Sequence, residues 1–112
     1  KAKRPFYIHA ADAPVLLFAA LWEPAHPRFG ELPSVSIVTR EADGPVAALH
    51  HRVPLMLSPD LAAAWCFGSA NDAAGIASTA PLPSLAWHAV DRRVGNVREQ
   101  GAGLIEPVAS LF

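Results

Sequence analysis

The feature that most constrains this chain is an uninterrupted apolar run from Val15 to Trp22. Periodicity cannot distinguish a buried strand from a buried helix in so short a run. The Asp-Ala-Pro turn before it and the strand-like segment 5–9 upstream favour a strand that is covered on both faces. Because a chain of 112 residues has few other elements to cover both faces, we predict a large exposed apolar surface or a further segment that covers it.

Composition excludes several classes of protein. Hydrophobic residues make up 52% of the chain and charged residues 17%, against a usual ~25% charged, so a folded core is expected rather than disorder. The formal net charge of -1 excludes a module that binds nucleic acid by bulk basic charge. One cysteine excludes a disulfide framework or a zinc finger built from cysteines. No apolar run reaches the ~18 residues of a membrane span, so no membrane partner is expected.

Alternating and β-branched residues predict strands over 5–9, 15–22, 35–39, 53–57 and 84–90, and residues 104–108 close the fold. The mixture of these strands with short helices predicts an α+β fold, with a mainly antiparallel twisted sheet and short inserted helices. Eight side chains are predicted to be buried in one core on this sheet: Phe6, Ile8, Leu16, Phe18, Ile37, Leu55, Leu57 and Trp87.

Helix starts are indicated at three places. Asp43 is a plausible N-cap of a short helix before residue 50. Ser58, with proline and aspartate after it, predicts a helix that ends at Gly68. A further short helix over 73–77 is capped by Asn71 or Asp72 in this interpretation.

The titratable residues give a weak signal by themselves. The histidines have no metal-ligand spacing, and adjacent histidines on a strand point to opposite faces, so no metal site is predicted. The lone Cys66 is predicted to be a small buried hydrophobic residue. The histidines are His9, His26, His50, His51 and His88.

The segment from His50 to Pro54 differs from the rest because it joins a helix end to a strand start, where side chains can converge on a cleft. A histidine with an ordinary pKa of ~6.5 can exchange protons at neutral pH. Arg52, two residues later, could hold a phosphate. From these residues alone, a functional site and a solvated loop both remain open.

Several segments together resemble one family. Their order and spacing cover nearly the whole chain and are similar to the SRAP family, the SOS-response-associated peptidases, which are abasic-site processing proteins that crosslink to DNA. The matching segments are Pro5–Ile8, Phe18–Glu23, Ile37–Thr39, Ala47–Pro59, Trp87–Val97 and Ile105–Val108.

The resemblance implies that residues 1–112 are a single domain that forms the C-terminal half of the family's domain. Family members begin with Met-Cys-Gly-Arg, and the cysteine forms a thiazolidine with the ring-opened abasic sugar. That cysteine, a nearby asparagine and the catalytic glutamate have no counterpart here, since Glu23 matches one strand too late. His50 matches the catalytic histidine, which moves protons in ring opening and Schiff-base chemistry. Thr39 and Arg52 match positions that line the DNA cleft, and His51 replaces a family aspartate.

The implied function is covalent crosslinking to abasic sites in single-stranded DNA, with lyase and self-processing peptidase activity and no cofactor. The implied partners are single-stranded DNA with abasic sites and the N-terminal half of the domain, in a protein that is a monomer when complete. The implied location is the bacterial cytoplasm, in association with the nucleoid. Two alternatives remain: a catalytically inactive DNA-binding or scaffold module of the same fold, and an unrelated metal-free hydrolase in which His50 acts with Cys66 or a serine.

Overall fold

A computed structural model describes residues 4–109, apart from the side chain of Phe29. The chain forms two compact units. The residues up to Pro14, together with those from Ser84 onward, make the first unit, and Val15–Pro83 makes the second. None of the helices in the described part of the chain is long and apolar enough to cross a membrane.

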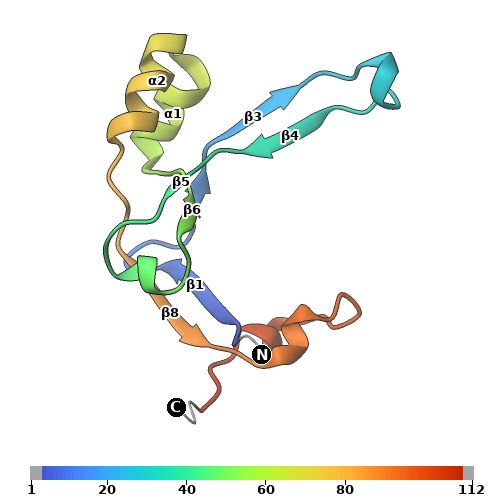
Figure 1. Ribbon diagram of the computed structural model, residues 1–112, viewed down its shortest axis with the longest axis vertical. Helices are drawn as coiled ribbons and strands as arrows, with labels where there is room; N and C mark the ends of the chain where they lie inside the picture. The colour runs from blue at the N-terminus through green and yellow to red at the C-terminus, as the bar shows by residue number, and fades with distance from the viewer. Residues whose placement is uncertain (1–3, 110–112) are drawn as a thin grey trace. The chain divides into compact units, whose positions relative to one another are not determined.

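The first unit is built on one antiparallel ladder. Strand β1 (Phe6–Ala10) pairs with β8 (Leu85–Ala89), as Figure 1 shows. In this register Phe6 lies opposite Ala89. Two short 3-10 helices follow, η3 (Arg92–Gly95) and η4 (Ala102–Ile105). The segment 104–108, predicted to close the fold, therefore begins within a 3-10 helix. The upstream strand pairs with β8 rather than with the apolar run.

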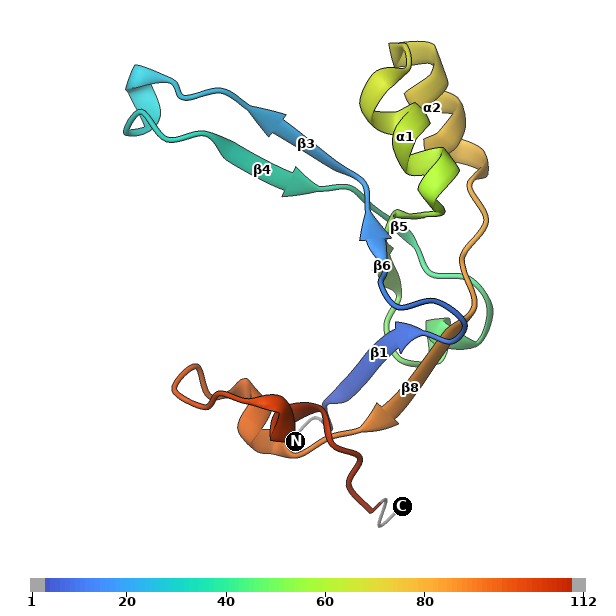
Figure 2. The same ribbon diagram turned by 180° about the vertical axis from the view of Figure 1, so that it is seen from behind.

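The second unit contains three chain segments that each form two short strands. Its ladders are all antiparallel and pair β2 with β7, β3 with β4, and β5 with β6 (Figures 1 and 2). The 3-10 helices η1 (Pro27–Phe29) and η2 (Gly44–Ala48) lie between strands. The strands are β2 (Leu17–Phe18), β3 (Ala20–Glu23), β4 (Ser34–Ile37), β5 (Thr39–Glu41), β6 (Arg52–Pro54) and β7 (Met56–Leu57).

A three-way junction explains why each segment is interrupted. The amide of Ala19 donates to Leu55 O at 2.8 Å, that of Leu55 to Val38 O at 2.8 Å, and that of Val38 to Ala19 O at 3.0 Å. These bonds close a ring in which every segment changes its partner while its backbone stays hydrogen-bonded. The run 15–22, predicted as one strand, is therefore divided at Ala19.

Two helices follow β7. Helix α1 (Pro59–Phe67) begins after Ser58, whose hydroxyl accepts from the Leu61 amide, and ends at Gly68, as predicted. Helix α2 (Ala70–Thr79) begins earlier than predicted. Its N-cap is Ser69 rather than Asn71 or Asp72, because Ser69 and Asp72 form a reciprocal capping box.

The core of the second unit lies at the junction, where it is covered by the helices. Trp65 of α1 packs against this core and donates from Nε1 to the carbonyl of Ala20 at 3.1 Å. Arg40 donates from Nη1 to the carbonyl of Ala80 at 2.5 Å, which ties β5 to the end of α2. The buried members of the core are Ala19, Leu55, Leu57, Ile76 and Ala80.

The α+β class and the antiparallel pairing are confirmed, but the single sheet and most of the predicted core are not. Leu55 and Leu57 are buried, as predicted. Phe6, Phe18 and Ile37 are exposed, which corrects their assignment to the core. Ile8, Leu16 and Trp87 are only half-buried.

The predicted exposed apolar surface is present. On the β3–β4 ladder, Leu21 is 62% exposed, Trp22 70% and Val35 68%. Described elements cover the junction but leave this ladder open, which is why alternation in the sequence did not lead to burial there.

Candidate functional site

Thr39 and Arg52 lie on the same face of the β5–β6 ladder. Thr39 is opposite Pro54 and Arg52 is opposite Glu41, so the two side chains are diagonal neighbours. Arg52 Nη2 donates to Thr39 Oγ1 at 2.9 Å. Among the described residues, Arg52 forms no ion pair with Glu41. Thr39 therefore orients an exposed guanidinium group that has donors left for a ligand.

His50 lies in the turn that leads from η2 into β6. Asp43 caps η2 by accepting from the Gly44 amide, as the sequence predicted, and the His50 amide donates to Val46 O. The His50 Nδ1 lies 3.0 Å from the Arg52 amide and 2.9 Å from the Arg52 carbonyl oxygen. The ring itself is exposed, so it is not a buried structural histidine.

This contact suits a ring that changes protonation state. Unprotonated Nδ1 accepts from the Arg52 amide, and protonated Nδ1 donates to the Arg52 carbonyl. The same position of the His50 ring is therefore compatible with both states. In the part of the chain that the structure describes, Nε2 of His50 has no hydrogen-bond partner. Nε2 is therefore the nitrogen of this ring that is open to a bound molecule.

His51 stacks on His50, with ring centroids 4.7 Å apart and an interplanar angle of 17°. The expectation that these adjacent side chains point to opposite faces is therefore wrong. The reason is local, because the two residues lie in the turn before β6 rather than in a strand. His51 can position the His50 ring by stacking. It does not supply the negatively charged hydrogen-bond acceptor that an aspartate would supply at this position.

Comparison with known proteins identifies the family. Residues 1–97 match the family model of the SOS response associated peptidases (SRAP). The chain belongs to the SRAP family. It is 40% identical over 110 residues to the abasic site processing protein YedK of Escherichia coli (strain K12), a match that covers 95% of this chain and 50% of that protein.

The fold is also found among solved structures. A crystal structure of a protein from Bacteroides thetaiotaomicron superposes with a TM-score of 0.79 at 14% identity, over 96% of this chain and 50% of that one. At this identity the likeness concerns the fold alone. The chain thus spans about half the length of the SRAP protein YedK and of this structural relative.

Cys66 is exposed, so its assignment as a buried residue is wrong. The residues of α1 that pack against the core are Leu61, Ala62, Ala64 and Trp65, and Cys66 is not among them. Both hydrogen bonds of the His50 ring go to the Arg52 backbone. Within residues 4–109, none joins this ring to Cys66 or to a serine, as the hydrolase alternative would require.

The other histidines have separate surroundings. His9 and His88 lie on the β1–β8 ladder with Tyr7, and their ring centroids are 6.0 Å apart. Spacing in the sequence does not indicate this cluster, because His88 comes from a strand distant in the chain from Tyr7 and His9. His26 Nδ1 accepts from the Arg28 amide and caps η1. In residues 4–109, no three histidine, cysteine or acidic residues gather in a group that could hold a metal ion.

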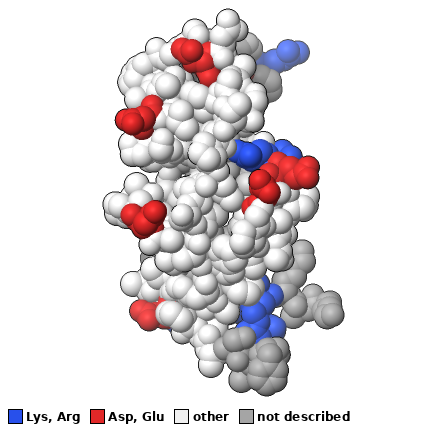
Figure 3. Space-filling view, turned by 90° about the vertical axis from the view of Figure 1, so that its left-hand side faces the viewer, with Lys and Arg blue, Asp and Glu red and all other residues white. Residues whose placement is uncertain are grey.

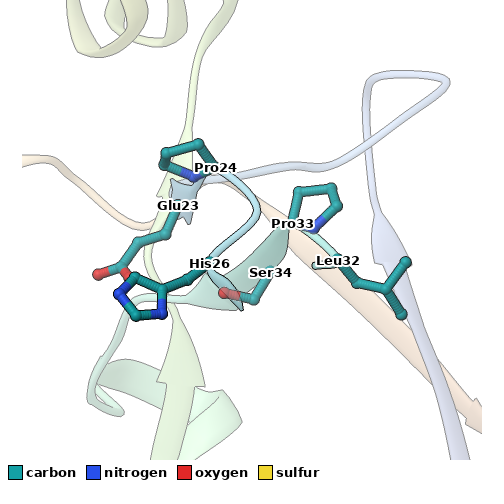
Figure 4. Close-up of a pocket in the computed structure, with 6 residues that line it drawn as sticks. All are labelled: Glu23, Pro24, His26, Leu32, Pro33 and Ser34. Atoms are coloured by element: carbon teal, nitrogen blue, oxygen red, sulfur yellow. The ribbon is translucent and has the colours of Figure 1, made fainter. Parts of the chain in front are cut away.

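A pocket of about 390 Å³ lies at the end of the β3–β4 ladder. Figure 4 shows the polar side chains of Glu23 and His26 on one side of it and Leu32 on the other. Glu23 is opposite Ser34 in the β3–β4 ladder and lines this pocket, whereas Thr39 and Arg52 belong to the β5–β6 ladder.

Proposed function

We propose that this chain is the C-terminal half of a domain that processes abasic sites in DNA by forming a covalent crosslink with them. Membership of the SRAP family and the similarity to YedK, which is named an abasic site processing protein, support the reaction class. In this proposal the domain is a cytoplasmic DNA-repair enzyme. The observation that carries it is the contact of His50 Nδ1 with the Arg52 backbone, since it holds an acid–base group beside an oriented guanidinium.

The reaction begins with the ring-opened abasic sugar, which carries an aldehyde. The α-amine of an N-terminal cysteine, supplied by the other half of the domain, adds to this carbon and forms a carbinolamine. Loss of water gives a Schiff base, and addition of the thiol then closes a thiazolidine. A protonated His50 Nε2 donates to the departing hydroxyl, and the neutral ring accepts a proton in the reverse direction. The same Schiff base is the intermediate of the proposed lyase activity. The proposed self-processing peptidase activity would remove the residue before that cysteine and so free its α-amine.

Arg52 contributes to binding rather than to bond formation. A guanidinium forms two parallel hydrogen bonds with a phosphate, and Thr39 already fixes the plane of this one. An abasic site has no base to read, so contacts with the phosphates carry much of the affinity. We therefore assign Arg52 and Thr39 to the DNA backbone beside the abasic sugar.

The exposed apolar ladder β3–β4 is the proposed seat of the other half of the domain. Leu21, Trp22 and Val35 are each more than 60% exposed. Fully burying a large apolar side chain contributes ~1.5–3 kcal/mol, so covering this ladder would stabilise the complete domain considerably. In this proposal the complete protein is a monomer whose two halves pack together.

His50→Ala in the longer protein that contains both halves tests the chemistry. Loss of the acid–base group is expected to slow crosslink formation, crosslink reversal or both by ~10²–10⁴-fold. The measurement is a single-turnover reaction with a single-stranded abasic oligonucleotide, followed by denaturing gel. Phe67→Ala, at a side chain that is 89% exposed on α1, is the control for loss of an exposed ring outside this turn. Wild-type rates in His50→Ala, in a variant that remains folded, would refute the assigned role.

Arg52→Met tests the binding role separately. Removing one phosphate contact from a single strand is expected to lower the slope of log affinity against log salt by ~0.7. Thr39→Val should weaken binding less, because it frees the guanidinium without removing its charge. Fluorescence anisotropy with an abasic oligonucleotide at several salt concentrations measures both. An unchanged slope in Arg52→Met would exclude a phosphate contact.

A further inference from the structure

A second basic feature lies in the first unit, which contains none of the residues assigned above. The β1–β8 ladder pairs Phe6 with Ala89, and the Val90 amide donates to the Pro5 carbonyl at 3.1 Å, one step beyond the ladder. The residues before β1 and after β8 therefore come together at one end. These segments are basic in sequence: Arg4 follows Lys1 and Lys3, which lie outside the described residues, and Arg92 and Arg93 follow β8.

The end of this ladder is hollowed into a pocket of about 370 Å³. Val90 is only 4% exposed, so it forms an apolar base, and the Val108 amide donates to the Ala89 carbonyl at 3.0 Å, which adds a third chain segment to the wall. The arginine side chains are exposed. The lining residues are Arg4, Pro5, Val90, Asp91, Arg92 and Val108.

The charges in this pocket are not balanced. Asp91 is its one acidic lining residue, and its Oδ1 accepts from the Arg93 amide, which caps η3. Arg93 forms an ion pair with Glu99, with 3.7 Å between Nη1 and Oε1. Among residues 4–109, neither Arg4 nor Arg92 forms an ion pair. Two guanidinium groups thus line one concave pocket, and neither is paired with a carboxylate of the described residues. A bound anion would lower the repulsion between their two positive charges.

We propose that the Arg4–Arg92 pocket binds a phosphate of a single-stranded nucleic-acid backbone. Arginine pairs match the geometry of phosphate oxygens, and the volume is large enough for a phosphate with part of its sugar. The apolar floor formed by Val90 suits the deoxyribose, because the carbon atoms of that sugar need no hydrogen-bond partner. Figure 3 shows a face of the molecule that is mostly neither basic nor acidic, with blue atoms in a few separate places. A few placed arginines rather than bulk charge would therefore bind the strand.

This inference rests on the proposed function for the nucleic acid being DNA, and it adds a second phosphate contact that does not involve the residues around His50. A contact here adds to the affinity for the backbone of a strand. It predicts affinity for unmodified single strands, in addition to any preference for the abasic site.

The test uses this 112-residue chain and an unmodified single-stranded oligonucleotide without an abasic site. The variants are Arg4→Gln, Arg92→Gln and the double variant, and the matched control is Arg28→Gln, an exposed arginine of the second unit. Each pocket variant is expected to weaken binding roughly three- to tenfold at low salt and to lower the salt slope by ~0.7. The control should keep wild-type affinity. Arg92→Lys keeps the charge and should keep the slope while losing some affinity.

A second arm separates the sources of phosphate. Titration of the chain with inorganic phosphate, followed by amide NMR signals of Val90 and Asp91, shows whether free phosphate occupies the pocket. Shifts with the oligonucleotide that are lost in Arg92→Gln support the proposal. Shifts with inorganic phosphate alone, or wild-type DNA affinity and slope in the double variant, would overturn it. Because this oligonucleotide has no abasic site, failure here leaves the His50 chemistry untouched, and failure of that chemistry leaves this result standing.

Discussion

The second unit has two regions that are built from the same kinds of residue but differ in their surroundings. At the three-way junction, Leu55 is 1% exposed and Leu57 6%, because α1 and α2 pack over them. On the β3–β4 ladder, Trp22 is 70% exposed and Ile37 52%. In the sequence, both regions consist of strand segments whose apolar residues either alternate with other residues or follow one another without interruption. The difference shows that the pattern specifies which side chains need cover, while the cover itself comes from other elements.

The largest effect is expected where the cover is complete. Leu55→Ala removes a fully buried side chain from the junction and should lower the free energy of unfolding by ~2–5 kcal/mol. Ile37→Ala, on the open ladder, should change it by less than ~0.5 kcal/mol in this chain. Urea unfolding followed by circular dichroism compares the two. Equal losses would mean that the ladder is covered within this chain after all.

Features that depend on neighbouring residues, such as helix caps, were predicted better than features that depend on contacts between distant segments. The start of α1 at Ser58 and its end at Gly68 were predictable, because caps act through neighbouring backbone groups. The interruption at Ala19 was not, since its cause is a ring of hydrogen bonds with residues 38 and 55. The burial of Phe18 was predicted wrongly for a related reason: alternation cannot tell whether a covering element exists.

The candidate site was predictable to a similar degree. The resemblance selected Thr39, His50 and Arg52, and the structure brings these three together through the turn at 50–52. The stacking of His51 on His50 was missed, because the turn rather than a strand determines where these rings point. The Arg4–Arg92 pocket could not be found by spacing at all, since the pairing of β1 with β8 joins the two ends of the chain.

The second prediction sharpens the comparison by changing the cover. Ile37→Ser in this chain should leave its stability unchanged within ~0.5 kcal/mol and reduce binding of a hydrophobic dye. In the longer protein with both halves, the same change should cost ~1.5–3 kcal/mol, because the side chain is then buried under our proposal. Val97→Ser, at a side chain that is 95% exposed, is the control outside the ladder. Equal small effects in both proteins would show that the other half does not cover Ile37.

The smallest effect is expected from the N-terminal cap of α2, one of the two helices that cover the junction. Helix α2 contributes Ile76 to the core, and the capping box of Ser69 with Asp72 satisfies the amides of its first turn at 3.1 and 2.9 Å. Ser69→Ala removes the hydroxyl that accepts from the Asp72 amide and should lower the free energy of unfolding by ~1 kcal/mol. Ser78→Ala is the matched control, since that hydroxyl only bonds back to the Ala74 carbonyl within the same helix and should change stability little. Urea unfolding of both variants measures the difference. If Ser69→Ala is as stable as Ser78→Ala, packing on Ile76 alone holds α2 over the junction, and the cap contributes nothing to the contrast between the two regions.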